Sequence, residues 1–486
     1  MAKKICVIGG GLAGGILSWN LAAAGHTVTL LERGDIPAPF VPTDEIWNGS
    51  DIKAPFTRGT GVGGTSNFWH GGLTILDQTD IEGVQGYFKY PKSPILYSEL
   101  RSYYDQAISL IRGKQDYSLR DIESQLDSRG IEFAINTEMF KTKALLYPTA
   151  PFSTRTLIEC AKEQHGLELV TNIEIKRVLF SERTRASIAE GVDLEQGITK
   201  KFYADIFILC AGGLGSPKIL LESAKLNSRL GKLPVGHFLI DHPTGFVFKA
   251  KLRRRMNLMP LFGQPGQGFR IRYGFALRPN WLHSSEYRNH VLFLRPAVSM
   301  KDPLTYDILK RKLVSYRGQN LKLVDFAYLL RNTDLLFEAV NFKYGIFHSA
   351  NYVSGLIFGE QLPNDKHRMY FGENNQFTIG WTVSKEDARS LEKFLNVFFD
   401  CHSSMFESFT IFPNVSERLD SAGHHSGGCR MATHPTDGVV NADLRVFGTE
   451  NLFIVDGSVL GYSGHANTGL TIAALALKCC DAVCNG

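Results

Sequence analysis

The sequence lacks paired-cysteine motifs, internal repeats, low-complexity tracts and any apolar run of membrane-spanning length. Its eight cysteines are scattered, with no CxxC pair and no metal-ligand spacing, so we expect reduced thiols in a cytoplasmic protein and no metal site. No uninterrupted apolar stretch is long enough for a transmembrane helix. Lys3, Lys4 and the apolar residues after them resemble a signal peptide, but the glycine pattern that follows explains them better.

The chain also lacks a strong excess of charge of either sign. Its formal net charge of +5 is a mild bias, whereas a nucleic-acid-binding protein concentrates basic residues on one face among aromatic residues. Three-residue basic runs occur only at 253–255 and 310–312. We interpret the first as a solvated strand end rather than an anion-binding patch, and we expect no nucleic-acid partner.

The first recognisable feature is a short apolar strand, residues 4–8, that runs into a glycine-rich turn and an Ala/Leu-rich helix. This is the context of a dinucleotide fingerprint, whose glycines permit a tight turn, close approach of a pyrophosphate and close helix packing. A second strand, residues 27–31, is followed by Glu32, whose carboxylate can accept a hydrogen bond from a ribose hydroxyl. The pattern leaves FAD or NAD as the nucleotide. The candidate cofactor-binding residues are Gly9, Gly11, Leu12, Ala13, Gly14, Glu32 and Arg33.

A second glycine-rich loop, residues 59–72, interleaves glycines with polar and aromatic residues. Glycines let the backbone pass close to a ligand. The polar groups between them suit a flavin ring and a pyrophosphate, and the alternative is a plain loop. The cofactor-binding candidates in this loop are Gly63, Gly64, Thr65, Asn67, Phe68, Trp69 and His70.

Two more strand-like segments lie in the middle of the chain. The apolar strand 204–210 ends at a glycine-rich turn and enters a helix at Lys218, so this turn could face the cofactor. Residues 167–179 are predicted as one strand, where contact with adenine is no better supported than an ordinary place in the sheet. The candidates in these segments are Ala211, Ser216 and Ile175.

The C-terminal part carries the most informative pattern. His424 opens the segment His-x-x-Gly-Gly-Cys-Arg-Met, and Asn467 directly precedes an apolar run, 468–482, that is predicted to be helical. The N-terminal amides of such a helix can stabilise negative charge. Further candidates for cofactor binding here are Asp456, Gly457 and Thr468.

The order of these motifs resembles that of the glucose-methanol-choline (GMC) flavoprotein oxidoreductases. The segments that carry the likeness are the fingerprint, Gly63-Gly64-Thr65-Ser66, Gly215-Ser216-Pro217, Asp241-His242-Pro243 and the C-terminal block. The resemblance implies an α/β fold, with a Rossmann-type FAD-binding domain and a discontinuous α+β substrate domain, and it favours FAD over NAD. It also implies that His424 is the catalytic histidine and that Asn467 stands where the family has a second His or Asn.

These residue types suit the oxidation of an alcohol, in which the hydroxyl loses a proton as hydride leaves carbon for flavin N5. His424 can take the proton near neutral pH. Asn467 cannot titrate, but its amide can hold the same oxygen and fix the carbon over N5. His425 and His465 are the rival candidates for the base.

Two positions depart from the family pattern. Phe68 stands where some relatives carry a histidine covalently joined to FAD, so we expect noncovalent FAD, although the nearby His70 could form such a bond. Thr468 replaces the proline that often follows the family's Asn, which allows a different geometry above the flavin.

The Ser66 to Gly72 loop is most similar to that of the sugar-oxidising branch of the family. We therefore expect the substrate to be a small molecule with an alcohol group, namely a sugar, glycoside or polyol. Side chains that could stack on it or hydrogen-bond to it are Trp69, His70, His348 and Trp381. The alternatives are a non-sugar alcohol, a non-redox lyase on the same scaffold, and a flavin-binding protein without activity. The sequence fixes neither the electron acceptor nor the oligomeric state.

A chain of 486 residues is too long for one ordinary core, so we expect two domains. The predicted FAD-binding domain comprises residues 1–75, 161–239 and 413–486, and the substrate domain comprises 76–160 and 240–412. Residues 304–347 are interpreted as a helical cap over the active site, with a membrane-touching amphipathic helix as the alternative. Residues at helical spacing that we expect to face a core are Leu391, Phe394, Leu395 and Phe398.

Overall fold

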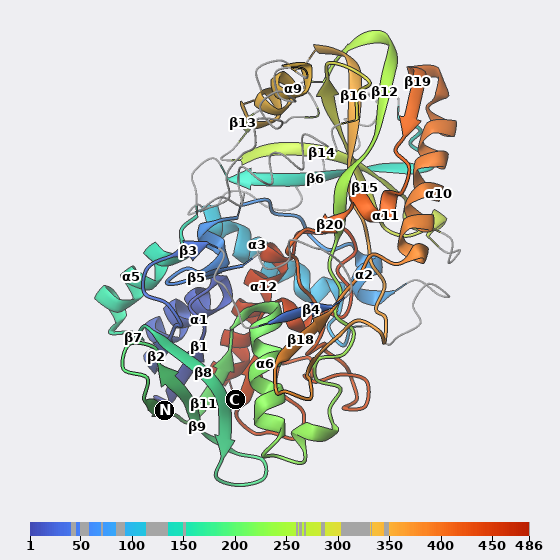
Figure 1. The fold of residues 1–486 in the computed structure, drawn as a ribbon. Coiled ribbons are helices and arrows are strands. Elements are labelled where there is room, and N and C mark those ends of the chain that lie inside the picture. Colours follow the sequence, from blue (N-terminus) through green and yellow to red (C-terminus); the bar gives the residue numbers. More distant parts are fainter. Residues whose placement is uncertain are drawn as a thin grey trace.

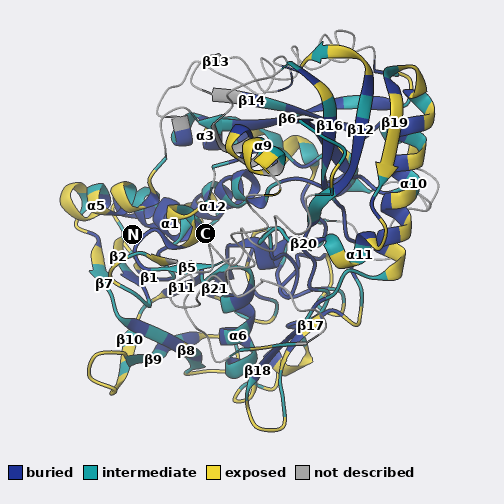
Figure 2. Ribbon diagram, turned by 45° about the horizontal axis from the view of Figure 1, so that its top comes forward, coloured by how far each residue is buried: buried dark blue, intermediate teal, exposed yellow. Residues whose placement is uncertain are grey.

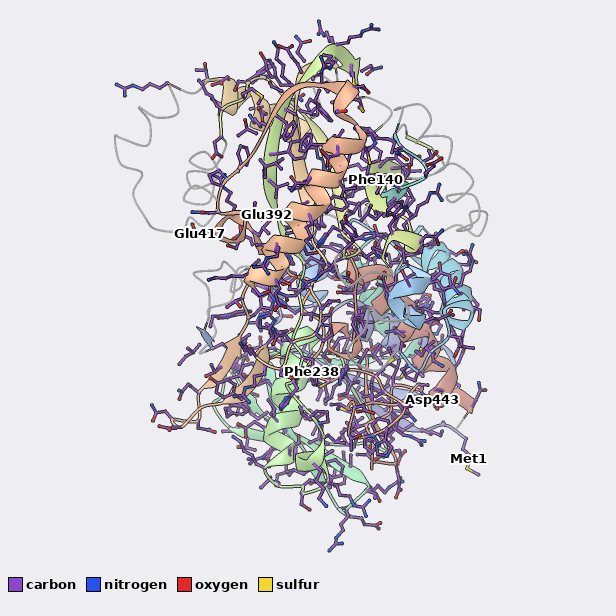
Figure 3. The ribbon with its side chains drawn as sticks, turned by 90° about the vertical axis from the view of Figure 1, so that its right-hand side faces the viewer. Met1, Phe140, Phe238, Glu392, Glu417 and Asp443 are labelled. Carbon is purple, nitrogen blue, oxygen red and sulfur yellow. The ribbon has the colours of Figure 1, made fainter. Side chains whose placement is uncertain are left out.

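The computed structural model has a lower half built around a parallel sheet and an upper half built around a large antiparallel sheet (Figure 1). Phe140 lies in the upper half, whereas Phe238, Asp443 and Met1 lie in the lower half (Figure 3). The residues that the structure describes are 1–39, 45–48, 58–69, 71–83, 93–112, 135–148, 152–258, 261, 265–266, 269–282, 287–302, 331, 333–344 and 349–485.

The lower sheet has five parallel strands in the order β21-β11-β1-β2-β7. Its strands are β1 (Lys4–Ile8), β2 (Thr27–Leu31), β7 (Glu168–Val170), β11 (Ile206–Leu209) and β21 (Leu452–Ile454). The main helices of this half are α1 (Leu12–Ala23), α5 (Thr154–His165), α6 (Gly212–Ala224) and α12 (Thr468–Asn485). α1 packs against both α5 and α12. The two strands predicted at the N-terminus are confirmed.

The single strand predicted over 167–179 is wrong, because the structure has two strands there. β7 joins the parallel sheet, whereas β8 (Ile173–Phe180) begins a separate antiparallel sheet with β9 (Ala186–Asp193) and β10 (Thr199–Tyr203). Between them Asn172 has a φ of 59°, a left-handed conformation that ends an extended strand and that Asn tolerates well. Periodicity alone does not reveal such a break.

The predicted start of α6 at Lys218 is also wrong. The helix begins at Gly212 and contains Pro217. Proline is unfavourable inside a helix because it has no N–H to donate to the helix hydrogen bonds. Its ring packs close to the backbone of Gly428. The helix therefore begins directly after β11, with its N-terminus at the carboxyl edge of the parallel sheet.

The upper sheet follows the order β13-β14-β15-β16-β12-β19, with β6 paired to β14 and β20 paired to β12. α10 (Lys385–Cys401) covers one face and buries the four apolar residues predicted to face a core, while its other side is exposed (Figure 2). The strands are β6 (Phe140–Pro148), β12 (Pro243–Asn257), β13 (Pro265–Gly266), β14 (Phe269–Leu277), β15 (Val291–Ala297), β16 (Ser349–Phe358), β19 (Phe406–Ile411) and β20 (Asp420–Ser421).

The remaining elements lie outside these two sheets. The helices are α2 (Gln78–Glu82), α3 (Tyr97–Arg112), α9 (Thr333–Tyr344) and α11 (Val415–Arg418). The 3-10 turns are η2 (Gly64–Asn67), η3 (Leu230–Lys232), η5 (Pro279–Trp281), η6 (Ser403–Met405) and η7 (Gly457–Val459). The short strands are β3 (Ala38–Pro39), β4 (Ile46–Asn48), β5 (Gly59–Thr60), β17 (Arg368–Phe371) and β18 (Phe377–Gly380).

Three further sequence expectations concern surfaces. By length and composition α12 could cross a membrane, contrary to expectation, but 61% of its apolar window is buried inside the fold, as in a core helix. The basic run 253–255 is exposed near the end of β12, as predicted. Of the predicted cap, 304–347, the structure describes α9 and Arg331, and the basic run 310–312 lies outside the described residues.

Candidate active site

The turn between β1 and α1 has room only for glycine at two positions. Gly9 has a φ of 109°, and a β-carbon there would overlap the carbonyl oxygen of Cys210, while one at Gly14 would overlap the Gly9 carbonyl oxygen. At Gly11, by contrast, a β-carbon would meet no atom within 4 Å. Gly9 and Gly14 allow β1 and α1 to pack closely, and Gly11 leaves space beside the N-terminus of α1.

Glu32 ties together the loops around this space. Its Oε2 accepts from the N–H of Gly10 at 2.6 Å, and its Oε1 accepts from the N–H groups of Gly34 at 3.2 Å and Gly61 at 3.1 Å. Burial raises the pKa of its carboxyl group, and the backbone donors oppose that rise. Glu32 thus holds three backbone segments together at the end of β2, and the half-buried Arg33 follows it.

The second glycine-rich loop packs directly on the first. Gly63 donates its N–H to the Gly10 carbonyl at 2.9 Å, and a β-carbon at Gly64 would lie 2.9 Å from the Gly11 Cα. Asn67 holds the turn by donating to the carbonyls of Val62 and Gly64 at 3.0 Å. The exposed Thr65 accepts from the Gly59 N–H, and the ring of Phe68 lies against Gly59.

Asp456 joins the turns that follow β11 and β21. Its Oδ2 accepts from Ser216 Oγ at 2.5 Å and its Oδ1 accepts from the Ser458 N–H at 2.9 Å, while Ser216 Oγ also accepts from the Ala211 N–H. Burial raises the pKa of the Asp456 carboxyl group. Gly457 is placed at the same edge, since it begins η7 directly after Asp456.

The described residues of this edge fit a bound dinucleotide. α1 and α6 both begin without a side-chain cap and without an acidic residue in their first turns, so backbone N–H groups there can serve an anion. Space exists beside Gly11 and Gly212, where a β-carbon would meet no atom within 4 Å. The amides of Leu12 and Ala13 would hold a pyrophosphate at the start of α1.

His424 lies on a loop that Asp241 anchors. Asp241 Oδ1 accepts from the N–H groups of His242 at 2.6 Å and His424 at 3.0 Å, and its Oδ2 accepts from Ser421 Oγ. Ser426 exchanges backbone hydrogen bonds with Ile240 at 2.9 Å in both directions. Burial raises the pKa of Asp241 to about 6, and its hydrogen bonds oppose that rise. The loop is therefore held along its length by residues 240–242.

The imidazole of His424 is half-buried beside His242. Burial lowers the pKa of His424 well below its usual value, with smaller contributions from His242 and His425, so the ring is neutral at pH 7. Its Nδ1 is buried without a hydrogen-bond partner among the described residues, which leaves Nε2 as the nitrogen that a ligand can reach.

Asn467 lies at the start of α12, where several segments meet. A β-carbon at Gly72 would lie 3.3 Å from Asn467 Nδ2 and 3.4 Å from the ring of Tyr147. Trp69 packs on Gly469 in the first turn of the helix, beside the buried Thr468. No hydrogen bond joins the Asn467 side chain to another described residue, and the side chain is partly exposed. Its amide is therefore free to bind a ligand.

His242 links this segment to His424. Burial lowers the pKa of His242 to about 4, and the backbone groups of Gly359, Ala466 and Gly464 beside its ring oppose that fall. Asn467 follows Ala466 directly. The two residues predicted to act together thus lie on segments that both contact one buried imidazole.

The two rival histidines are both buried. His425 Nε2 lies 3.7 Å from Asp241 Oδ2, and His465 Nδ1 lies 3.0 Å from the carbonyl oxygen of Asn289. Burial lowers the pKa of each to about 3. Because only His424 of the three is partly exposed, the geometry favours it as the base.

Some predicted residues have other settings. Ile175 is buried against Gly191 in β8, whose first residue, Ile173, donates its N–H to the Glu32 carbonyl oxygen at 3.0 Å. Trp381 is buried and its Nε1 donates to Gln361 at 2.6 Å, so it is packed rather than offered to a substrate. His70 and His348 lie outside the described residues.

The sequence analysis assigned no site role to Asp241, His242, Gly72 or Tyr147. The signal for the first two was present, since Asp241-His242-Pro243 is one of the motifs that carry the family resemblance. The other two have no such motif, because their relation to Asn467 depends on the pairing of the segment after Gly72 with β6 of the upper sheet.

Comparisons with known proteins agree with this geometry. Two models described as GMC oxidoreductase match residues 152–244 and 373–476. The two matched segments make up about two fifths of the chain, and over both of them the chain is similar to GMC oxidoreductases. GMC oxidoreductases are FAD-dependent oxidoreductases that act on alcohol groups, and these matches support an enzyme of that class here.

Two curated relatives have named substrates. The chain is 22% identical to the 2-methyl-1,2-propanediol dehydrogenase of Mycolicibacterium austroafricanum over an alignment 557 positions long, which covers 98% of this chain and 94% of that protein. It is 32% identical to the fructose dehydrogenase large subunit of Gluconobacter japonicus over 338 residues, which cover 66% of this chain and 55% of that protein.

Two solved structures share the fold. Pyridoxine 4-oxidase from Mesorbium loti superposes with a TM-score of 0.57 at 16% identity and covers 99% of both chains. Formate oxidase from Aspergillus oryzae superposes with a TM-score of 0.59 at 15% identity and covers 98% of this chain and 97% of its own.

Proposed function

We propose that this protein is a GMC oxidoreductase that oxidises an alcohol on a sugar, glycoside or polyol, with His424 as the base. The observation that carries the proposal is the state of His424, which is partly exposed, uncharged and held through its peptide N–H by Asp241. A neutral imidazole is the form that accepts a proton. The likeness to fructose dehydrogenase supports the sugar as the substrate class.

Each residue has a defined part in the reaction. His424 Nε2 takes the hydroxyl proton as the C–H bond breaks and the C=O bond forms. The Asn467 amide donates to the same oxygen and holds the carbon in place. When bound, FAD supplies the acceptor for the hydride. Asp241 keeps the His424 loop in position and touches no reacting atom.

We also propose that FAD is held without a covalent bond. Phe68 lies against Gly59 and offers no nucleophile, and the α1 and α6 termini supply backbone donors for the phosphates. Acid precipitation of the holoenzyme should leave a colourless pellet and a yellow supernatant. A yellow pellet would show that a covalent bond is present.

The function is tested by following flavin absorbance without oxygen while sugars, glycosides, polyols and simple alcohols are added to the holoenzyme. A sugar or polyol should bleach the flavin, and His424→Asn should slow bleaching by about 10²- to 10⁴-fold. The matched control is His434→Ala, which removes an exposed histidine ten residues farther along the chain.

The alternatives give different results. If no alcohol bleaches the flavin, the oxidation proposal is wrong and a non-redox reaction on the same scaffold remains. If bleaching by simple alcohols is faster than by any sugar, the substrate class is wrong. If His424→Asn reacts as fast as the wild type, the assignment of the base is wrong.

A further inference from the structure

Asn289 lies directly before β15 and is fully buried. Its N–H donates to Glu360 Oε2 at 2.7 Å. Its side-chain amide donates to Asp77 Oδ2 and Asp80 Oδ1, each at 3.0 Å. Asp77 also binds two lysines of β6, at 2.9 Å and 2.7 Å. Asn289 and these three acids form the Asn289 network. Because Asn289 cannot shift without breaking hydrogen bonds to all three carboxyl groups, it is a fixed point at the start of β15.

His465 binds this fixed point and stands two residues before Asn467. Its Nδ1 lies 3.0 Å from the carbonyl oxygen of Asn289 and 3.2 Å from its Oδ1. Both atoms are acceptors, since the side-chain nitrogen of Asn289 donates to carboxyl groups, so Nδ1 carries the ring proton. Burial, and then the charge of Lys143, lower the pKa of His465 to about 3. The other nitrogen, Nε2, is buried, so the neutral ring serves as a donor.

The residue before His465 is held in the same place. A β-carbon at Gly464 would lie 2.5 Å from Asp80 Oδ2, so the buried carboxyl group of Asp80 packs directly against the chain there. Gly464 has a φ of 53°, in the left-handed region where glycine is favoured. The chain that leads into Asn467 is therefore held at two successive residues, by Asp80 at Gly464 and by Asn289 at His465.

A second branch of the Asn289 network leads to the His424 loop. Glu360 accepts from the N–H of Asn289, and the next residue, Gln361, accepts through Oε1 from the N–H of Asp241 at 3.4 Å. Asp241 in turn accepts from the N–H of His424 at 3.0 Å. One buried network thus reaches both parts of the candidate active site, and it can fix the position of one part relative to the other.

We propose that His465 is a positioning residue, which transmits the fixed position of Asn289 to the Asn467 amide, so that this amide and His424 meet the same hydroxyl oxygen. This inference rests on the proposed function. Placement matters because a displacement of about 1 Å at a reacting group can lower a rate by about 100-fold. His465 touches no reacting atom in this role, and His424 keeps the role of the base.

Two substitutions of nearly equal shape test the donor. His465→Leu removes the Nδ1–H group, whereas His465→Asn places an amide N–H where Nδ1 stands. With flavin bleaching followed without oxygen, His465→Leu should lower kcat by about 10- to 100-fold and change KM less. His465→Asn should recover much of kcat. If His465→Asn is as slow as His465→Leu, or if His465→Leu has the kcat of the wild type, the inference is wrong.

His402 offers a matched control in the upper half of the molecule. Its ring is also buried, and its Nδ1 lies 2.6 Å from the Phe398 carbonyl oxygen at the C-terminal end of α10. Its Nε2 accepts from the N–H of Asn136, so Nδ1 is again the donor. His402→Leu should reduce thermal stability but leave kcat unchanged. If it lowers kcat as much as His465→Leu does, a general loss of stability explains both effects and the inference fails.

Hydrogen exchange separates this inference from the proposed function. The Ala466 N–H donates to the Ser463 carbonyl oxygen at 3.0 Å, so its exchange reports the opening of this turn. In the holoenzyme without substrate, it should exchange at least about 10-fold faster in His465→Leu than in His465→Asn. That result supports the role of His465 even if no alcohol bleaches the flavin, in which case only the oxidation proposal fails. Equal exchange in the two variants would overturn the inference even if a sugar is oxidised.

Discussion

His242 and His424 pack edge to face, with ring centroids 5.1 Å apart and ring planes at 76°. Both ring nitrogens of His242 are buried without a hydrogen-bond partner among the described residues. An imidazole in that setting is most stable uncharged, because no partner replaces the lost water. His424, the candidate base, therefore packs against an uncharged His242 ring. A proton on either ring makes protonation of the other less favourable.

The first prediction concerns the pH dependence of the rate. Burial disfavours the charged imidazolium, so the pKa of His424 is lowered and its neutral form persists as the pH falls. The acid limb of kcat/KM should accordingly lie below pH 6.5 rather than at it. The profile is measured with each sample returned to pH 7 afterwards to check for irreversible loss. A limb above pH 6.5 would contradict the lowered pKa.

The second prediction concerns Asp241, a positioning residue. Asp241→Ala removes the acceptor of the His424 N–H and of Ser421, and a misplaced base should lower kcat by about 10- to 100-fold with a smaller change in KM. Asp241→Asn keeps an oxygen for the backbone donors and should recover much of kcat. Bound flavin is measured in both variants. Wild-type kcat in Asp241→Ala would show that the loop holds its position without this carboxylate.

The third prediction concerns stability against pH. Folded His242 resists protonation until a pKa of about 4, whereas in the unfolded chain it takes a proton near pH 6.5. The wild type should therefore lose stability relative to His242→Asn as pH falls from 6.5 to about 4, by up to about 1.4 kcal/mol per pH unit. Buried Asp241 has a raised pKa and the opposite effect, but it is present in both proteins. Urea unfolding at several pH values measures the difference, and parallel curves would contradict it.

The fourth prediction concerns the close packing of α6 against the His424 loop. A β-carbon at Gly213 would overlap the carbonyl oxygen of His425, so Gly213→Ala should reduce stability by about 1–3 kcal/mol and lower kcat. The control is Gly231→Ala, where the nearest atom lies 3.6 Å away. Thermal unfolding and turnover are measured for both. Equal behaviour would mean that the loop can move aside at no cost.

The sequence predicts the parts of the fold whose signals are local. The glycines after β1 are predictable because the turn there has no room for a larger residue. Glu32 is predictable because it is the acid that directly follows β2. The core stripe of α10 follows from helical spacing. Such features depend on neighbours within a few residues, so a single sequence contains them.

The sequence does not predict features that depend on distant contacts. The break at Asn172 arises because the chain leaves one sheet for another, and the role of Asp241 depends on a bond to a residue 183 positions away. The closeness of Tyr147 to Asn467 needs the pairing of Leu73 with Leu146 in β6. No periodicity reveals these pairings.

The bonding of residues 240–242 to the His424 loop has a consequence for recombining this enzyme with its relatives. A chimera that takes residues 240–412 from another protein would import a foreign partner for the native loop at 421–426. The backbone bonds between Ile240 and Ser426 and the carboxylate of Asp241 form one unit. Substrate range is therefore best exchanged by moving both segments together.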